Sequence, residues 1–338
     1  MSSDHDVYGA AFFSPLNFNL IFHLLSKILN LMDSVYLIFH LRPARQKARN
    51  VAVFEVLSLL RDLNPQAPVG GPLADQGGVF WITLPPNTLD LALPRLSRLG
   101  YTTAVDLLEP LPSGSKRHTK KKQSPDTITW RGQPHRLVRV FEEDATEARE
   151  SAPDRRTFIF ETDDGQIRPI KGYRGSSGDL SHRALPVCDA RMLANLALQD
   201  DSDSLLDPFA GTGGILLEAP SQTRTLSGDS DPALRHGLRQ LVTLHCLTDA
   251  AQLPYSDNSI PAIATEPPYN SSSTPKVADA LAEMIRVLKP GGRIAMLCAS
   301  HQGDPLRQAA LRFALEVHVD SPVNRKGTEC AVLVWGKQ

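Results

Sequence analysis

Residues 205–219 read Leu-Leu-Asp-Pro-Phe-Ala-Gly-Thr-Gly-Gly-Ile-Leu-Leu-Glu-Ala. The apolar start predicts a short strand that ends at Asp207, and Ile215 to Ala219 predict the opening of a helix. The glycines between them allow a tight turn, because a residue without a Cβ leaves room for a ligand against the backbone. A helix start also presents unpaired N–H groups and the positive end of its dipole. The segment therefore predicts the β-α corner of a nucleotide-binding sheet.

The glycine spacing argues against an NAD site. The dinucleotide fingerprint needs a small residue at its third conserved position, and counting from Gly211 that position holds Leu216. A leucine is too large for the close packing of helix on strand that the fingerprint requires.

Acids recur at the expected ends of the next strands. Asp229 follows a strand-like stretch 22 residues after Asp207, and an acid there can accept hydrogen bonds from ribose hydroxyls. Asp231 and Pro232 fit the cap and first position of the following helix. Asp249 lies 20 residues beyond Asp229 and reads either as another ligand or as a turn residue.

A proline-rich loop follows the next apolar strand, where residues 266–269 read Glu-Pro-Pro-Tyr. An amino group conjugated to an aromatic ring is a poor nucleophile. A carboxylate and a proline carbonyl can accept its two N–H bonds and aim its lone pair at a methyl donor. The prolines stiffen the loop, and the tyrosine ring can stack on a base.

The order of these segments resembles the class I S-adenosylmethionine (SAM) methyltransferases. In particular, Asp-Pro-Phe-x-Gly-Thr-Gly-Gly resembles the family that methylates the exocyclic amine of a guanosine in tRNA, whose members usually carry a THUMP RNA-binding domain. The resemblance implies SAM as cofactor. The residues that it assigns to cofactor binding are Asp207, Phe209, Gly211, Thr212, Gly213, Asp229 and Asp249. The residues that it assigns to the acceptor site are Glu266, Pro267, Pro268 and Tyr269.

Glu266 departs from the family, which has Asp at this position. The extra methylene leaves nitrogen methylation as the expected reaction but puts the identity of the acceptor in question, because a misplacement near 1 Å can cost about a hundredfold in rate.

The remaining pattern predicts an α/β chain with a seven-stranded sheet, closed by an antiparallel hairpin, and a smaller ferredoxin-like α+β domain in front. We expect a poorly ordered extension over 1–31 and the ferredoxin-like domain over 32–111. A basic linker over 112–126 and a strand-rich connection over 127–184 follow, and the methyltransferase domain covers 185–338. The connection is too short for a whole THUMP domain, which is therefore shortened or absent.

Composition fits a cytoplasmic enzyme. The 338 residues are 41% hydrophobic with a net charge of −1, so no global basic field indicates nucleic-acid binding. No apolar run is long enough to span a bilayer, no Cys/His spacing indicates a metal, and we read the four cysteines as free.

The sequence thus predicts methyl transfer to N2 of guanosine in tRNA, with RNA and a possible accessory protein subunit as partners. Three alternatives stay open. One is a nitrogen methyltransferase for DNA, rRNA or a protein amide. Another is a non-catalytic relative that only binds SAM or RNA. The third is a binding module whose methyltransferase half is purely structural and does not bind SAM.

Overall fold

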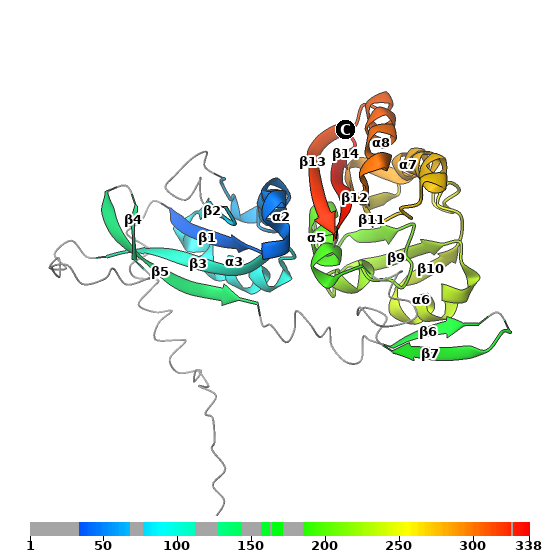
Figure 1. The fold of residues 1–338 in the computed structure, drawn as a ribbon, viewed down its shortest axis with the longest axis horizontal. Coiled ribbons are helices and arrows are strands. Elements are labelled where there is room, and N and C mark those ends of the chain that lie inside the picture. Colours follow the sequence, from blue (N-terminus) through cyan, green and yellow to red (C-terminus); the bar gives the residue numbers. More distant parts are fainter. Residues whose placement is uncertain are drawn as a thin grey trace, which may run out of the picture.

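The computed structural model describes residues 34–67, 77–111, 127–130, 132–143, 157–162, 164–171, 185–325 and 327–338. The expected extension over 1–31, the basic linker expected over 112–126 and residues 172–184 lie outside these ranges. The described residues form a five-stranded sheet, a seven-stranded sheet and a two-stranded hairpin. Figure 1 shows the two larger sheets side by side, with the hairpin below the second.

The seven-stranded sheet confirms the predicted methyltransferase fold. Its strand order is β10-β9-β8-β11-β12-β14-β13, in which the first five strands run parallel and β14 is antiparallel to β12. The closing hairpin of β13 and β14 is antiparallel, as expected. The strands are β8 (Ser204–Asp207), β9 (Arg224–Asp229), β10 (Leu244–Leu247), β11 (Ile260–Thr265), β12 (Leu288–Ala299), β13 (Glu316–Arg325) and β14 (Thr328–Gly336).

Both faces of this sheet are buried, and successive side chains of the central strands point alternately to one face and to the other. Leu205, Ala262 and Ala264 point to the face covered by α5 (Val187–Ala197). Leu206 and Ile263 point to the opposite face, which α7 (Thr274–Val287) and α8 (Ser300–Arg312) cover. The period of two in a strand places neighbouring residues on opposite faces, so a strand with helices on both sides is apolar throughout.

One local prediction differs from the structure. Residues 215–219 do not open an α-helix: only the 3-10 turn η7 (Leu216–Glu218) forms, because Pro220 cannot continue the turn that ends at Ala219. Before α7, Asn270 accepts from the Ser273 N–H and caps η9 (Ser271–Ser273), and Pro275 lies in the first turn of α7.

Two short elements form the crossover between β9 and β10. These are η8 (Pro232–Leu234) and α6 (Arg235–Leu241). Asp231 accepts from the Ala233 N–H and caps η8, in line with the predicted helix start.

The first sheet is antiparallel throughout, with the order β2-β1-β3-β5-β4. β1 lies between β2 and β3, which are therefore parallel to each other and joined by a helical crossover. This is the split β-α-β unit of ferredoxin-like folds. The elements are β1 (Val35–Leu41), η1 (Pro43–Ala48), α2 (Arg49–Leu59), η2 (Arg61–Leu63), β2 (Val79–Leu84), η3 (Pro86–Thr88), α3 (Leu89–Ala92), η4 (Leu93–Arg98), β3 (Thr102–Pro110), β4 (Thr127–Trp130) and β5 (Gln133–Glu142).

The division of the chain at residue 111 requires correction. β4 and β5 had been expected in the connection over 127–184, yet β5 pairs with β3 across Ala104 to Pro110 and extends the first sheet. We call residues 34–143, within the described ranges, the N-terminal unit. The helical crossover between β2 and β3 is broken into α3 and η4, with Pro94 at the break.

The remaining expected strand pair forms the hairpin of β6 (Thr157–Glu161) and β7 (Ile167–Lys171). Phe158 of β6 is buried in a small cluster with Ala210, Leu234 and Leu238. The hairpin therefore packs beside α6 and against the turn that follows β8 (Figure 1).

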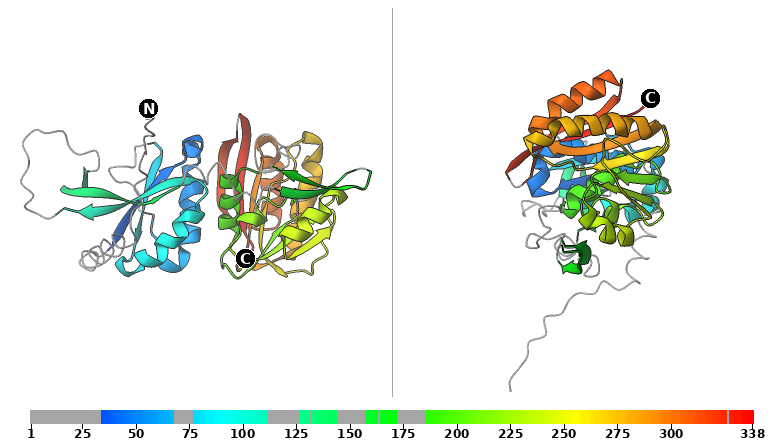
Figure 2. Two further views of the ribbon diagram at one scale, coloured as in Figure 1. Left: turned by 90° about the horizontal axis from the view of Figure 1, so that it is seen from below. Right: turned by 90° about the vertical axis from the view of Figure 1, so that its right-hand side faces the viewer.

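The N-terminal unit packs directly on the seven-stranded sheet, with α2 against α5 and β13 (Figure 2). One continuous apolar cluster runs through both units. A Cβ on Gly100 would overlap the Cys188 carbonyl oxygen at the start of α5, so the two backbones meet closely there. Glu55 is fully buried and accepts from the Asn195 amide of α5 at 2.8 Å. Among the helices of the described residues, none is long and apolar enough to cross a membrane.

Candidate functional site

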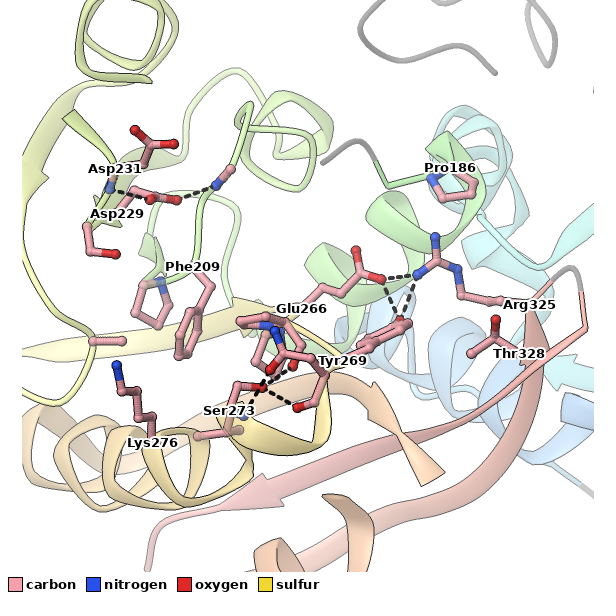
Figure 3. Close-up of a pocket in the computed structure, with 18 of the residues that line it drawn as sticks. Pro186, Phe209, Asp229, Asp231, Glu266, Tyr269, Ser273, Lys276, Arg325 and Thr328 are labelled. Atoms are coloured by element: carbon pink, nitrogen blue, oxygen red, sulfur yellow. Dashed lines mark hydrogen bonds and ion pairs between the residues drawn. The ribbon is translucent and has the colours of Figure 1, made fainter. Parts of the chain in front are cut away.

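A cavity of about 1460 Å³ opens at the carboxyl edge of the parallel strands. Its lining includes Asp229 at the end of β9, Gly211 and Asp249 from the loops after β8 and β10, and Glu266 and Tyr269 from the loop after β11. Arg42 and Arg45 of the N-terminal unit and Arg325 of the closing hairpin also line it. The parallel strands place their carboxyl ends at one edge, which is where ligands bind in such sheets. Figure 3 shows the cavity from inside.

The glycine turn and Asp229 form one side of the cavity. Gly211 has φ +52°, a conformation that glycine adopts without a Cβ penalty. Its N–H donates to Asp229 Oδ2 at 2.8 Å, and the Asp231 N–H donates to Oδ1 at 2.9 Å. The two N–H bonds fix the carboxylate at the cavity wall, which Asp229 lines.

Three residues assigned to cofactor binding are buried instead of lining the cavity: Asp207 at the end of β8, and Thr212 and Gly213 within the turn itself. Asp207 accepts from the Phe209 N–H at 3.1 Å and from the Thr265 hydroxyl at 2.7 Å. Burial raises the pKa of Asp207 to about 7, and the negative charges of Asp229 and Glu266 add to the rise. In the structure Asp207 acts on the shape of the turn.

Phe209 and Asp249, which the resemblance assigns to cofactor binding, both line the cavity. Phe209 is partly buried against the core beside α7 and presents an apolar surface to the cavity. Asp249 is exposed, and its Oδ1 accepts from the Ala251 N–H at 3.0 Å in the turn after β10. Both of its alternative roles, ligand and turn residue, are thus compatible with its position.

The proline loop is held from behind by its second proline. The Pro268 carbonyl accepts from the Ser273 hydroxyl and from the Gln302 amide, each at 2.8 Å. In the part of the chain that the structure describes, the Pro267 carbonyl has no hydrogen-bond partner. The loop therefore offers one anchored carbonyl and one carbonyl available to a ligand.

The Glu266 carboxylate is paired through one oxygen. Oε1 accepts from the Tyr269 hydroxyl at 2.5 Å and from Arg325 Nη1, which also donates to the Tyr269 oxygen at 2.7 Å (Figure 3). Among the described residues nothing donates to Oε2. Burial raises the pKa of Glu266, while Arg325 and the Tyr269 hydroxyl oppose the rise by favouring the charged form.

The sequence did not indicate Arg325, Asp189 or Arg45. Residues 324–329 read as a polar turn, and no spacing connects Arg45 with a site more than 200 positions away in the chain. The only local signal was the helix before β8, whose Asp189 is a charged residue among apolar neighbours.

No group of three or more His, Cys, Asp or Glu side chains that could hold a metal ion occurs among the residues with a described position. The polar groups around the cavity are instead backbone N–H groups, carboxylates and guanidinium groups. They suit a ligand that carries hydroxyls and amines.

Comparisons with known proteins agree with the predicted resemblance. A family model described as the RMKL-like methyltransferase domain matches residues 189–229, which run from α5 to the end of β9. The tRNA (guanine(10)-N2)-dimethyltransferase of Methanothermobacter thermautotrophicus is 35% identical over 116 residues. These cover 32% of this chain and 33% of that protein, so the match spans about a third of the relative's length.

Two solved structures are also similar. TrmN from Thermus thermophilus aligns over 90% of this chain and 100% of its own, with a TM-score of 0.49 and 16% identity. A methyltransferase in complex with the Haloferax volcanii Trm112 methyltransferase activator aligns over 44% of this chain and 87% of its own, with a TM-score of 0.36 and 14% identity. Identity this low carries no information about substrate.

Proposed function

We propose that the chain is a SAM-dependent methyltransferase that acts on an exocyclic amino nitrogen, with N2 of guanosine in tRNA as the acceptor. The observation that carries the proposal is the pair of free acceptor atoms in one loop, Glu266 Oε2 and the Pro267 carbonyl, in the same cavity as Asp229. The aligned curated relative acts on guanine N2 in tRNA, which favours this acceptor.

The residues around the glycine turn fit SAM. In the proposal Asp229 accepts from the ribose hydroxyls, Asp249 accepts from the adenine amine, and Phe209 and Gly211 flank the methionine portion. When bound, SAM supplies an electrophilic methyl group. In the proposal Asp207, Thr212 and Gly213, which are buried, support the shape of the turn without contacting the cofactor.

On the acceptor side, Oε2 and the Pro267 carbonyl would each accept one N–H of the amine. Both bonds together hold the nitrogen lone pair toward the cofactor side of the cavity. Oε2 is also the atom placed to take the proton that the nitrogen loses, because burial raises the pKa of Glu266. The Tyr269 hydroxyl donates a hydrogen bond to Glu266, and in the proposal the Tyr269 ring stacks on the base that carries the amine.

An accessory protein subunit remains part of the proposal. β10 is an edge strand of the seven-stranded sheet, and Leu244 and Leu247 on it are 42% and 52% exposed. Unpaired edge strands are templates for pairing with another chain. Full activity of the isolated chain would remove the need for such a subunit. An enzyme acting on tRNA would work in the cytoplasm, which we propose as its location.

The test is methyl transfer from labelled SAM to total RNA from a strain that lacks this gene, with nucleosides separated by mass. Label in N2-methylguanosine of the tRNA fraction supports the proposal. Label in rRNA, or in DNA or protein offered in parallel, would move the acceptor to that class. SAM binding without transfer to any of them would indicate a non-catalytic relative.

A further inference from the structure

Arg325 lies at the end of β13 with its guanidinium between two carboxylates. On one side it pairs with Glu266 Oε1, and on the other its Nε lies 3.5 Å from Asp189 Oδ2. The side chain of Arg325 is 17% exposed, that of Glu266 21%, and that of Asp189 is completely buried. The two carboxylates fix the guanidinium in this position. If Arg325 moved away from either of them, a buried negative charge would lose an ion-pair partner.

Fixing Glu266 matters because of its length. Glutamate has one more rotatable bond than aspartate, so an unrestrained carboxylate would occupy several positions relative to the proline loop. Arg325 and Tyr269 both bind Oε1, which selects one position of the carboxylate and leaves Oε2 without a donor among the described residues (Figure 3). The three side chains together hold the longer acid in a single geometry.

Asp189 is in turn held by the N-terminal unit. Arg45 donates to both of its oxygens, with Nη2 2.9 Å from Oδ1 and 2.7 Å from Oδ2. The Tyr101 hydroxyl donates to Oδ1 at 2.9 Å. Arg45 Nη1 also donates to the Asn324 carbonyl at 2.9 Å, directly before Arg325. One arginine of the N-terminal unit, Arg45, therefore holds both the buried carboxylate of Asp189, which pairs with Arg325, and the end of β13, which contains Arg325.

We propose that Arg325 is the positioning residue of the acceptor site, and that the N-terminal unit, through Arg45, sets the position of Arg325 and thereby of Glu266. The inference rests on the proposed methyl transfer for its kinetic consequence. The contacts from Arg45 to Glu266 are independent of which acceptor is used.

The kinetic test is a double-mutant cycle with Arg325→Met and Glu266→Gln. If Arg325 acts through Glu266, R325M lowers turnover about 10- to 100-fold in the native background, as expected for a misplaced reacting group. It changes turnover less than about twofold in the E266Q background, because residues that act as a unit are non-additive. Arg325→Lys keeps the charge without the planar fork and should recover part of the turnover.

Two outcomes would overturn the positioning role. Equal losses from R325M in both backgrounds would mean that Arg325 acts apart from Glu266. A rise in KM for RNA that steepens with salt, at unchanged kcat, would mean that Arg325 is a phosphate contact.

A second test needs no acceptor. We call the chain of contacts from Arg45 through Asp189 and Asn324 to Arg325 and Glu266 the relay, and this test separates failure of the relay from failure of the proposed function. Arg45→Lys keeps a cation beside Asp189 but cannot reach its two oxygens and the Asn324 carbonyl together. Hydrogen–deuterium exchange of the full chain should then rise in the peptide that contains Asn324 and Arg325. Arg98→Lys is the matched control. Arg98 of the N-terminal unit also donates to a residue of the other unit, Asp201, at 2.8 Å, and within the described part of the chain none of its hydrogen bonds is to β13 or β14.

Increased exchange in the peptide that contains Asn324 and Arg325 in R45K but not in R98K supports the proposed effect of Arg45 on Arg325. Equal exchange in both variants overturns it. Tyr101→Phe is the second variant if R45K unfolds, because it removes a single hydrogen bond to Asp189. It should raise exchange in the same peptide to a smaller extent, and no rise would again overturn the relay.

Discussion

The side of the cavity that we propose binds the cofactor (the cofactor side) and the side that we propose binds the acceptor (the acceptor side) are built in different ways. Asp229 is held by N–H groups of Gly211 and Asp231, which belong to adjacent strand ends of one sheet. Glu266 is held by side chains, and its support reaches through Arg325 and Asp189 to a second unit of the chain. Backbone groups fixed by a sheet give a site that tolerates side-chain changes around it. A site held by side chains depends on every member, so the acceptor side is the place where this protein can differ from its relatives.

The largest effect should follow Glu266→Ala. Loss of the carboxylate removes the atoms that orient and deprotonate the amine, so turnover should fall by about a hundredfold or more. SAM affinity, measured by calorimetry, should change less than about twofold. If both quantities fell together, the separation of cofactor and acceptor sides would be wrong.

Glu266→Asp sharpens the same comparison. The shorter acid cannot keep both the Arg325 and Tyr269 contacts without a shift of the loop, so we expect turnover to fall rather than rise. A gain in activity would mean that the aspartate geometry of the related family survives here and that the Arg325 contact is dispensable.

Asp229→Ala tests the cofactor side. It removes charge-assisted hydrogen bonds worth about 1.5–3 kcal/mol, which corresponds to roughly a 10- to 150-fold weaker SAM Kd. Asp231→Ala is the control, because Asp231 caps η8 and should cost about 1 kcal/mol of stability with little change in Kd. The reverse pattern would assign the ribose to Asp231.

Gly237→Ala tests whether the β6–β7 hairpin supports the cofactor side alone. A Cβ at Gly237 on α6 would overlap the Phe158 ring, so the variant should lose about 1–3 kcal/mol of unfolding free energy in urea. Phe158→Leu in the same background should recover part of the loss. Exchange at Arg325 should not change in either variant. A change there would link the hairpin to the acceptor side.

The pH dependence of stability should depend on Asp207, because burial raises its pKa to about 7 in the folded protein. Below the unfolded pKa of about 3.9 both states hold the proton, and the full contribution to stability is present. As pH rises from about 4 to about 7, the unfolded chain releases the proton first and this contribution is lost. Asp207→Asn should therefore flatten the decline in unfolding free energy over that window, measured in urea. Parallel curves would mean that Asp207 is charged when folded.

The sequence predicted the features that depend on short stretches of chain. The glycine turn, the acid after β9 and the proline loop were found because each is set by neighbouring residues at a strand end. Parallel strands then bring those ends to one edge of the sheet. The same reasoning could not show that Asp207 is buried, because residues 205–219 do not reveal which side of the turn faces the cavity. Nor could it assign β4 and β5 to the first sheet, since pairing with β3 is a non-local contact.

What the sequence by itself determined is the cofactor side, whose residues are close in the chain or follow successive parallel strands. What only the tertiary structure decided is how Glu266 is held. Its partner Arg325 is 59 residues away, and Arg45 and Asp189 are 144 residues apart. Such pairs form when two units pack and leave buried charges that must be neutralised. The amino-acid pattern around each residue carries no record of that requirement.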